Sequence, residues 1–139
     1  MQFKDFKYHD HRNSHTELNE IYFWTTTINN WQQLLKPDEN KIIAINSLQW
    51  LVHKELVKIY GYVIMPNHIH LIWEQLKMNG KEMPKNSFGK FTAKTLLNIM
   101  QMSNSEALNN YQIDATVRSF NIWQRDPSAV QLLNIAMAA

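Results

Sequence analysis

Residues 60–73 have the sequence Tyr60-Gly61-Tyr62-Val63-Ile64-Met65-Pro66-Asn67-His68-Ile69-His70-Leu71-Ile72-Trp73, which is typical of a strand, a tight turn and a second strand. Aromatic and β-branched residues dominate both halves of the stretch. Pro66 and Asn67 separate the halves, because proline fixes φ and asparagine tolerates turn geometry. The stretch therefore predicts a β-hairpin.

The second strand of this hairpin carries two histidines on one face. Successive side chains of a strand point to opposite sides, so His68 and His70 share a face, while Ile69, Leu71 and Trp73 share the other. Two adjacent imidazoles on a strand whose opposite face is buried have the geometry of a metal site. The alternative from spacing alone is a pair of half-exposed surface histidines without a ligand.

The bulk composition bounds the class of protein. The chain has 139 residues, 45% of them hydrophobic, which suits one domain with one core. The net charge is +2 and the pI is about 8.8, below the value of about 9 that marks a strongly basic nucleic-acid-binding domain. Cysteine is absent, which excludes disulfides, thiolate metal sites and cysteine nucleophiles. With no apolar run of membrane-spanning length and no signal-peptide pattern, we expect a soluble cytoplasmic protein.

The pattern along the chain predicts an α+β fold. We expect a strand at 21–28, a helix from an N-cap at Asp38 to about Lys58, the hairpin at 59–75, a helix capped by Asn86 or Ser87, and a strand at 117–124 that Pro127 ends. This β–α–β–β–α–β order matches a ferredoxin-like split βαβ layout, an antiparallel sheet with helices on one face. The histidine pair would lie on an inner strand, on the open face. The apolar stripe expected on the second helix is Phe88, Phe91, Thr95, Leu96, Ile99 and Met100.

Three parts follow from this pattern: a flexible N-terminal arm at 1–19, a central domain at 20–127, and a short tail at 128–139. The arm contains His9-Asp10-His11, which repeats the spacing of the histidine pair without β-branched support. For this second pair we expect a loose polar arm and not a metal site.

The octapeptide Met65–Ile72 resembles the signature of the single-tyrosine transposases that act on single-stranded DNA. These include the REP-associated tyrosine transposases and related insertion-sequence transposases, in which a proline-containing turn precedes His-hydrophobic-His. Residues 21–27 resemble the first strand of that family, and residues 120–126 resemble its later Trp-Gln strand. The resemblance covers roughly residues 20–127, in the family's order.

The resemblance implies a reaction and a set of partners. A tyrosine hydroxyl attacks a DNA phosphodiester, while a divalent ion, Mg²⁺ or Mn²⁺, polarises the scissile phosphate. His68 and His70 would be the metal ligands. The partner would be single-stranded or hairpin DNA, bound by a homodimer. The side chains expected to support DNA binding are Asn67, Lys90, Lys94, Arg118, Gln124 and Arg125.

The sequence leaves open whether this protein is an enzyme, because the expected tyrosine nucleophile is missing from its usual position. In the family the tyrosine follows the Trp-Gln strand, whereas residues 125–139 contain none. Of Tyr22, Tyr60, Tyr62 and Tyr111, only Tyr111 lies outside a predicted strand, so it is the candidate nucleophile. One hypothesis is a transposase that cleaves and joins single-stranded DNA. The other is a C-terminally truncated relative that binds DNA hairpins without breaking strands. A third reading is an unrelated ferredoxin-like domain with a chance histidine pair.

Overall fold

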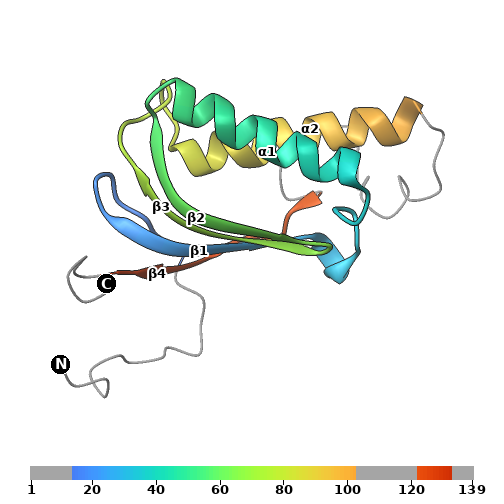
Figure 1. Cartoon of the computed structure of the whole chain (residues 1–139), viewed down its shortest axis with the longest axis horizontal. Coiled ribbons are helices and arrows are strands. Elements are labelled where there is room, and N and C mark those ends of the chain that lie inside the picture. The colour runs from blue at the N-terminus through green and yellow to red at the C-terminus, as the bar shows by residue number, and fades with distance from the viewer. Residues whose placement is uncertain (1–13, 103–121, 133–139) are drawn as a thin grey trace, which may run out of the picture.

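The computed structural model describes residues 14–102 and 122–132. Figure 1 shows two helices lying together over one side of a curved sheet. In chain order the elements are β1 (Ile21–Thr27), the short 3₁₀ helix η2 (Asn29–Trp31), α1 (Asp38–His53), β2 (Val57–Met65), β3 (His68–Gln75), α2 (Pro84–Met102) and β4 (Ser128–Gln131).

The four strands form one sheet in the order β2-β3-β1-β4. Every neighbouring pair is antiparallel, so β1 and β2 run in the same direction with β3 inserted between them. The α+β fold with an antiparallel sheet and helices on one face is therefore confirmed, while the finer ferredoxin-like assignment stays a prediction. The strand that carries the histidine pair is an inner strand, as the sequence predicts.

The core lies between the sheet and the two helices. Along β3 the side chains alternate strictly between partly buried and buried, and Ile69, Leu71 and Trp73 are all on the buried side. The ring of Trp73 packs on that of Trp24 from β1, with centroids 5.0 Å apart. Phe88 of α2 meets Trp24 edge-on, at 6.0 Å. These contacts attach α2 to the central strands, which leaves the other face of β3 available for polar chemistry.

Both helices differ from the sequence prediction at one end. The first helix ends at His53 and not near Lys58, because Glu55 adopts the left-handed conformation (φ 59°) that terminates helices. Val57 is therefore the first residue of β2, not the last turn of a helix. The second helix begins at Pro84, two residues before the predicted cap, since proline suits the first helical position. Its exposed side includes Phe91 and Ile99, which the sequence placed in the core.

The fourth strand lies beyond the position predicted for it. Residues 117–121 are outside the described residues, and Trp123 makes only an isolated antiparallel bridge with Ile28. The strand β4 follows Pro127, where we expected the strand to end, and pairs with β1. Composition favoured the segment rich in aromatic residues over Ser128–Gln131, but pairing with β1 selects the latter. The sheet therefore extends into the segment expected to be a tail.

No helix in the described ranges is long and apolar enough to cross a lipid bilayer.

Candidate metal and DNA site

The hairpin turn that precedes the histidines is held in place from both sides. Its loop consists of Pro66 and Asn67, between the last residue of β2 and the first of β3. The carbonyl oxygen of Asn67 accepts a hydrogen bond of 2.9 Å from the backbone N–H of Ile28, and that of Pro66 accepts one of 2.9 Å from Leu35. Both donors are completely buried residues. The turn is thereby anchored to the core, which fixes where β3 begins.

The two histidines lie next to each other on the face of the sheet opposite the helices. Their ring centroids are 4.6 Å apart and the ring planes meet at 76°. The predicted alternation is confirmed, because both histidines are partly buried while Ile69 between them has no exposed surface. The pairing register places Thr27 of β1 opposite His68 and Thr25 opposite His70.

A neighbouring oxygen binds one nitrogen of each imidazole. The Nδ1 atom of His68 lies 2.6 Å from Oδ1 of Asn67, and that of His70 lies 2.8 Å from Oγ1 of Thr25. Because an amide oxygen only accepts, Nδ1 of His68 donates in this contact, which leaves Nε2 as the nitrogen that can bind a metal. Neither Nε2 atom has a hydrogen-bond partner in the part of the chain described. Oriented imidazoles with one nitrogen hydrogen-bonded and the other available are typical of metal ligands.

The environment favours the neutral form of His70. Burial lowers the pKa of His70, and the neighbouring His68 lowers it further. Neutral imidazole is the form that binds metals. The ring of Phe23 stacks on His70 with centroids 5.2 Å apart and an interplanar angle of 20°. One side of the imidazole is therefore shielded from water.

The donor set fits a divalent ion in part. In residues 14–102 and 122–132 no group of three His, Cys, Asp or Glu side chains could enclose a metal. The pair supplies two nitrogen ligands, and oxygen atoms of water or of a bound substrate would complete the coordination. A site with open positions of this kind suits a catalytic ion better than a structural one.

Two solved structures share this architecture. The first is a REP-associated tyrosine transposase bound to a REP hairpin (TM-score 0.55, 16% identity), aligned over 94% of this chain and 66% of that one. The second is a protein from Deinococcus radiodurans R1 named as a transposase (TM-score 0.52, 10% identity), aligned over 92% of this chain and 91% of that one.

The chain has a transposase fold. No family model and no curated protein matches its sequence. The likeness is therefore one of architecture, and the chain spans about two thirds of the REP-associated transposase.

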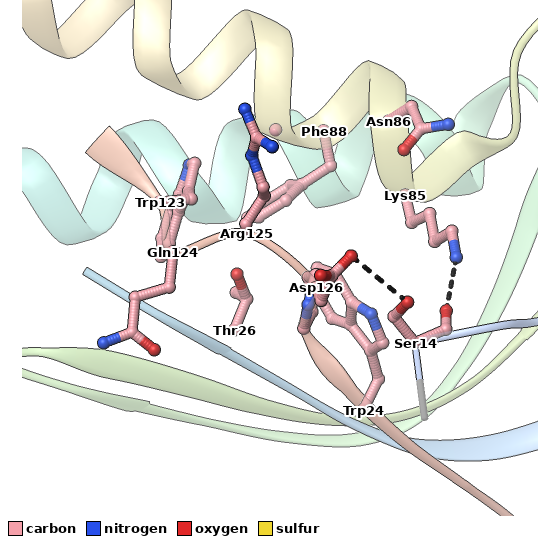
Figure 2. A pocket seen from close by; sticks show the side chains of 12 residues that line it. Ser14, Trp24, Thr26, Lys85, Asn86, Phe88, Trp123, Gln124, Arg125 and Asp126 are labelled. Atoms are coloured by element: carbon pink, nitrogen blue, oxygen red, sulfur yellow. Dashed lines mark hydrogen bonds between the residues drawn. The ribbon is translucent and has the colours of Figure 1, made fainter. Parts of the chain in front are cut away.

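The predicted DNA-binding residues do not all lie beside the histidine pair of this transposase fold. Asn67 does, through its contact with His68. The backbone N–H of Gln124 donates a 2.7 Å hydrogen bond to the carbonyl of Thr27, which puts Gln124 next to the strand position opposite His68. Lys90 and Lys94 lie on α2, in the helical layer, and Arg125 lies close to the start of α2 (Figure 2). Arg118 and Tyr111 are outside the described residues.

The tyrosines of the described ranges are engaged elsewhere. Tyr22 is buried, and its hydroxyl accepts a 2.8 Å hydrogen bond from the backbone N–H of Glu17. The hydroxyl of Tyr60 donates to Glu74 at 2.9 Å, and hydrogen bonding to this carboxylate adds to the effect of burial in raising the pKa of Tyr60. Tyr62 pairs with Leu71, whose side chain points to the helical layer. Tyr22 and Tyr62 lie on the helical side of the sheet and Glu74 holds the hydroxyl of Tyr60, so none of the three is placed for attack at the histidine pair.

Sequence reasoning missed the contribution of β1 to this site. Thr25 and Phe23 hold and cover His70, yet nothing local in the first strand marks them as partners of a histidine 45 residues later. The one indication in the sequence is the two-residue alternation of β1, which places Phe23 and Thr25 on the same face of the strand. Only the register of β1 against β3 brings them to the imidazole.

Lys90 forms an ion pair whose contribution to stability should disappear at low pH. Its Nζ lies 2.7 Å from Oε2 of Glu82. Lys90 lowers the pKa of Glu82 and Ser87 contributes to the same effect, while burial opposes both. Because the pKa of Glu82 is lower in the folded protein than in the unfolded chain, its ionised carboxylate stabilises the fold at pH values above the unfolded pKa of about 4.3. This stabilisation is lost as the pH falls through the pKa of the folded state.

We therefore expect Lys90→Met to cost less than about 1 kcal/mol at pH 7, because the lysine is mostly exposed. Urea unfolding at several pH values measures this, with Lys94→Met on the same helix as the control. The gap between wild type and Lys90→Met should close below about pH 4. A gap that is constant down to pH 2 would mean that the ion pair does not stabilise the fold.

Proposed function

We propose that this protein is a transposase-type protein that binds single-stranded or hairpin DNA and acts on it with a divalent metal ion, Mg²⁺ or Mn²⁺. The observation that carries the proposal is the pair of adjacent imidazoles, each with Nδ1 hydrogen-bonded and Nε2 available. The likeness to a transposase bound to a REP hairpin supports DNA as the partner.

When bound, the ion would polarise the scissile phosphodiester and offset the negative charge that develops on its oxygens. His68 and His70 would hold the ion through their Nε2 atoms. Asn67 and Thr25 fix the ring orientations, so little reorganisation is needed when the ion binds. Phe23 limits the access of water on one side of His70. The covalent step needs a tyrosine hydroxyl, for which Tyr111 is the proposed nucleophile.

The open face of the sheet offers bases an apolar surface with few charges. Phe23, Val63, Met65 and Val130 are all more than a third exposed, and their strand partners place them on the side of the histidine pair. Unpaired bases stack on such surfaces with little regard to sequence. We propose that Asn67 and Gln124 supply polar contacts beside this surface. Lys90, Lys94 and Arg125 lie in or against the helical layer, so we propose that they contact phosphates of DNA that continues beyond the open face, and Arg118 is a further proposed phosphate contact.

Hairpin binding should weaken steeply with salt. If three or four cationic side chains contact phosphates, raising NaCl from about 50 to 200 mM should lower the affinity about ten- to hundredfold, because bound cations release counterions. Fluorescence anisotropy with a labelled hairpin measures this, and a fully paired blunt duplex is the control. An affinity that does not change with salt would refute the phosphate contacts, and equal affinity for the duplex would refute a preference for hairpins.

The residues that orient the imidazoles should tune metal affinity. We expect Thr25→Val and Asn67→Ala each to raise the Kd for Mn²⁺ about tenfold, because loss of such partners typically costs 10- to 100-fold. Thr26→Val on the same strand is a matched control for the first, since Thr26 pairs with Ile69 and faces the core. Isothermal titration calorimetry measures all three. Equal affinities in Thr25→Val, Asn67→Ala and wild type would show that these contacts do not position metal ligands.

A second candidate function is DNA binding without strand cleavage. The placement of the described tyrosines favours it, because none offers a free hydroxyl next to the histidine pair. Retained hairpin binding without covalent product distinguishes this case.

Assembly as a homodimer belongs to the same proposal. The exposed side chains of Trp50 on α1 and Phe91 on α2 line one hollow on the helical side, away from the face proposed for DNA, and we propose that two copies associate there. Light scattering at increasing protein concentration tests this, and a monomer at all concentrations would refute it.

A further inference from the structure

A cavity of about 200 Å³ lies on the helical side of the sheet, on the face opposite the histidine pair. Figure 2 shows its walls: β1 below, the first turns of α2 above, and the segment leading into β4 between them. Side chains from both ends of the described chain meet here, including Ser14, Trp24, Lys85, Trp123, Arg125 and Asp126. None of the chemistry proposed at His68 and His70 uses this cavity.

The cavity contains a buried hydrogen-bond donor without an acceptor. Among residues 14–102 and 122–132 the indole Nε1 of Trp24 has no hydrogen-bond partner, although Trp24 is only 2% exposed. In Figure 2 the ring reaches up from β1 into the space beside Ser14 and Asp126. Trp123, on the opposite wall, is satisfied, because its Nε1 donates to Thr92 at 2.9 Å. Buried polar groups are nearly always paired, and Trp24 borders a cavity, so its N–H is a donor for an acceptor that residues 14–102 and 122–132 do not supply.

The charges around the cavity favour an anion. Lys85 donates one hydrogen bond, of 2.7 Å, to the carbonyl of Ser14, and an ammonium has two further protons to donate. Burial lowers the pKa of Lys85, while Asp126 acts in the opposite direction. Arg125 lines the same cavity, and α2 directs the positive end of its dipole toward it. Asp126 is the one carboxylate among the lining residues, and its Oδ1 accepts from the hydroxyl of Ser14 at 3.5 Å. The lining residues therefore include two cations and one carboxylate.

The size of the cavity and the burial of its aromatic residues exclude a stacked base. Trp24, Phe88 and Trp123 are 2%, 1% and 3% exposed, and they pack on one another and on the core. A nucleobase would need a free ring face, which none of them offers. A small oxyanion needs only a few donors at its perimeter, and those are present.

We propose that this cavity binds a phosphate-type oxyanion, with the indole N–H of Trp24 and the ammonium of Lys85 as its two main donors. The source of the phosphate group is either free inorganic phosphate or the backbone of a bound DNA strand. The first source is independent of the proposed function, and the second rests on it.

The test titrates the full chain with inorganic phosphate by isothermal titration calorimetry, against sodium chloride at matched ionic strength. Trp24→Phe removes the N–H and keeps an aromatic ring. Trp73→Phe is the matched control, because Trp73 also has a buried, unpartnered Nε1 but does not line the cavity. We expect Trp24→Phe to raise the Kd for phosphate about tenfold, as loss of a hydrogen bond to a charged group does. Trp73→Phe should leave the Kd unchanged.

Lys85 provides a second, independent comparison. Lys85→Met should raise the Kd for phosphate at least tenfold, whereas Lys85→Arg, which keeps the charge, should stay within a few-fold of wild type. Circular dichroism confirms the fold of each variant. Heat signals equal for phosphate and chloride would overturn the proposal, and so would a Trp24→Phe variant and a Lys85→Met variant that both bind phosphate as wild type does.

A competition arm separates the two sources. If a saturating DNA hairpin displaces phosphate and Trp24→Phe also weakens hairpin binding, the group comes from the DNA backbone. If phosphate binds equally with and without the hairpin, the site serves the free anion. Phosphate binding in a protein that binds no hairpin would support this cavity site and refute the proposed DNA function.

Discussion

Replacing both histidines, in a His68→Ala/His70→Ala variant, should abolish detectable Mn²⁺ binding and raise the Kd at least 100-fold. The two imidazoles are the nitrogen ligands of the proposed site, and no third His, Cys, Asp or Glu lies close enough to replace them among the described residues. Removing both leaves only hydroxyl and amide oxygens, which bind transition ions far more weakly than imidazole. Calorimetric titration with Mn²⁺ measures the loss directly.

A matched control separates the site from histidine content in general. His53 is exposed on α1, away from the open face of the sheet, so His53→Ala should bind Mn²⁺ as the wild type does. The double variant should stay folded, because neither imidazole is part of the buried core. Wild-type affinity in the double variant would show that any bound ion lies elsewhere, for example near the histidines of the N-terminal arm.

Truncating Trp73 to alanine should lower the free energy of unfolding by about 3 to 5 kcal/mol, the range for large aromatic residues removed from a core. Trp73 has no exposed surface and packs on Trp24 with centroids 5.0 Å apart. Its Nε1 has no partner in the part of the chain that the structure describes, so the truncation leaves no acceptor unsatisfied there. The whole cost is the lost packing and the cavity. For a domain with roughly 5 to 15 kcal/mol of stability, this loss is a large fraction.

Urea unfolding followed by circular dichroism measures the cost, and Trp50→Ala is the control. Trp50 has the same side chain on α1 but is 47% exposed, so its truncation should cost less than half as much. Equal costs for the two variants would contradict the assignment of Trp73 to the centre of the core.

The sequence contained the hairpin and the histidine face because both depend on local rules. The loop Pro66-Asn67 and the two-residue period of β3 fix which side chains are buried, and the structure confirms them. The end of α1 and the position of β4 depend instead on contacts between segments that are distant in the sequence. The left-handed Glu55 ends α1 early, and β4 forms after Pro127 because β1 offers Ser128–Gln131 an edge to pair with. Neither feature has a period or composition that a single sequence displays.

The site also combines residues that local spacing identifies with residues that only non-local pairing brings together. Spacing identified His68 and His70 as a pair, but the partners Thr25 and Phe23 come from a strand that only the register places beside them. The lysines of α2 were grouped with the histidines through a resemblance, and the fold puts them in the other layer. The metal role of the histidines, the contacts to DNA and the role of Tyr111 stay predictions.

The most direct test of the central claim is a search for a covalent protein–DNA adduct. Single-stranded DNA carrying a hairpin is incubated with the full chain and Mn²⁺ or Mg²⁺, and the products are separated on a denaturing gel. We expect an adduct that requires the ion and is absent from the His68→Ala/His70→Ala variant, while Tyr111→Phe tests the nucleophile. No adduct with either ion, with hairpin binding retained, would contradict cleavage and leave a DNA-binding protein with a transposase fold.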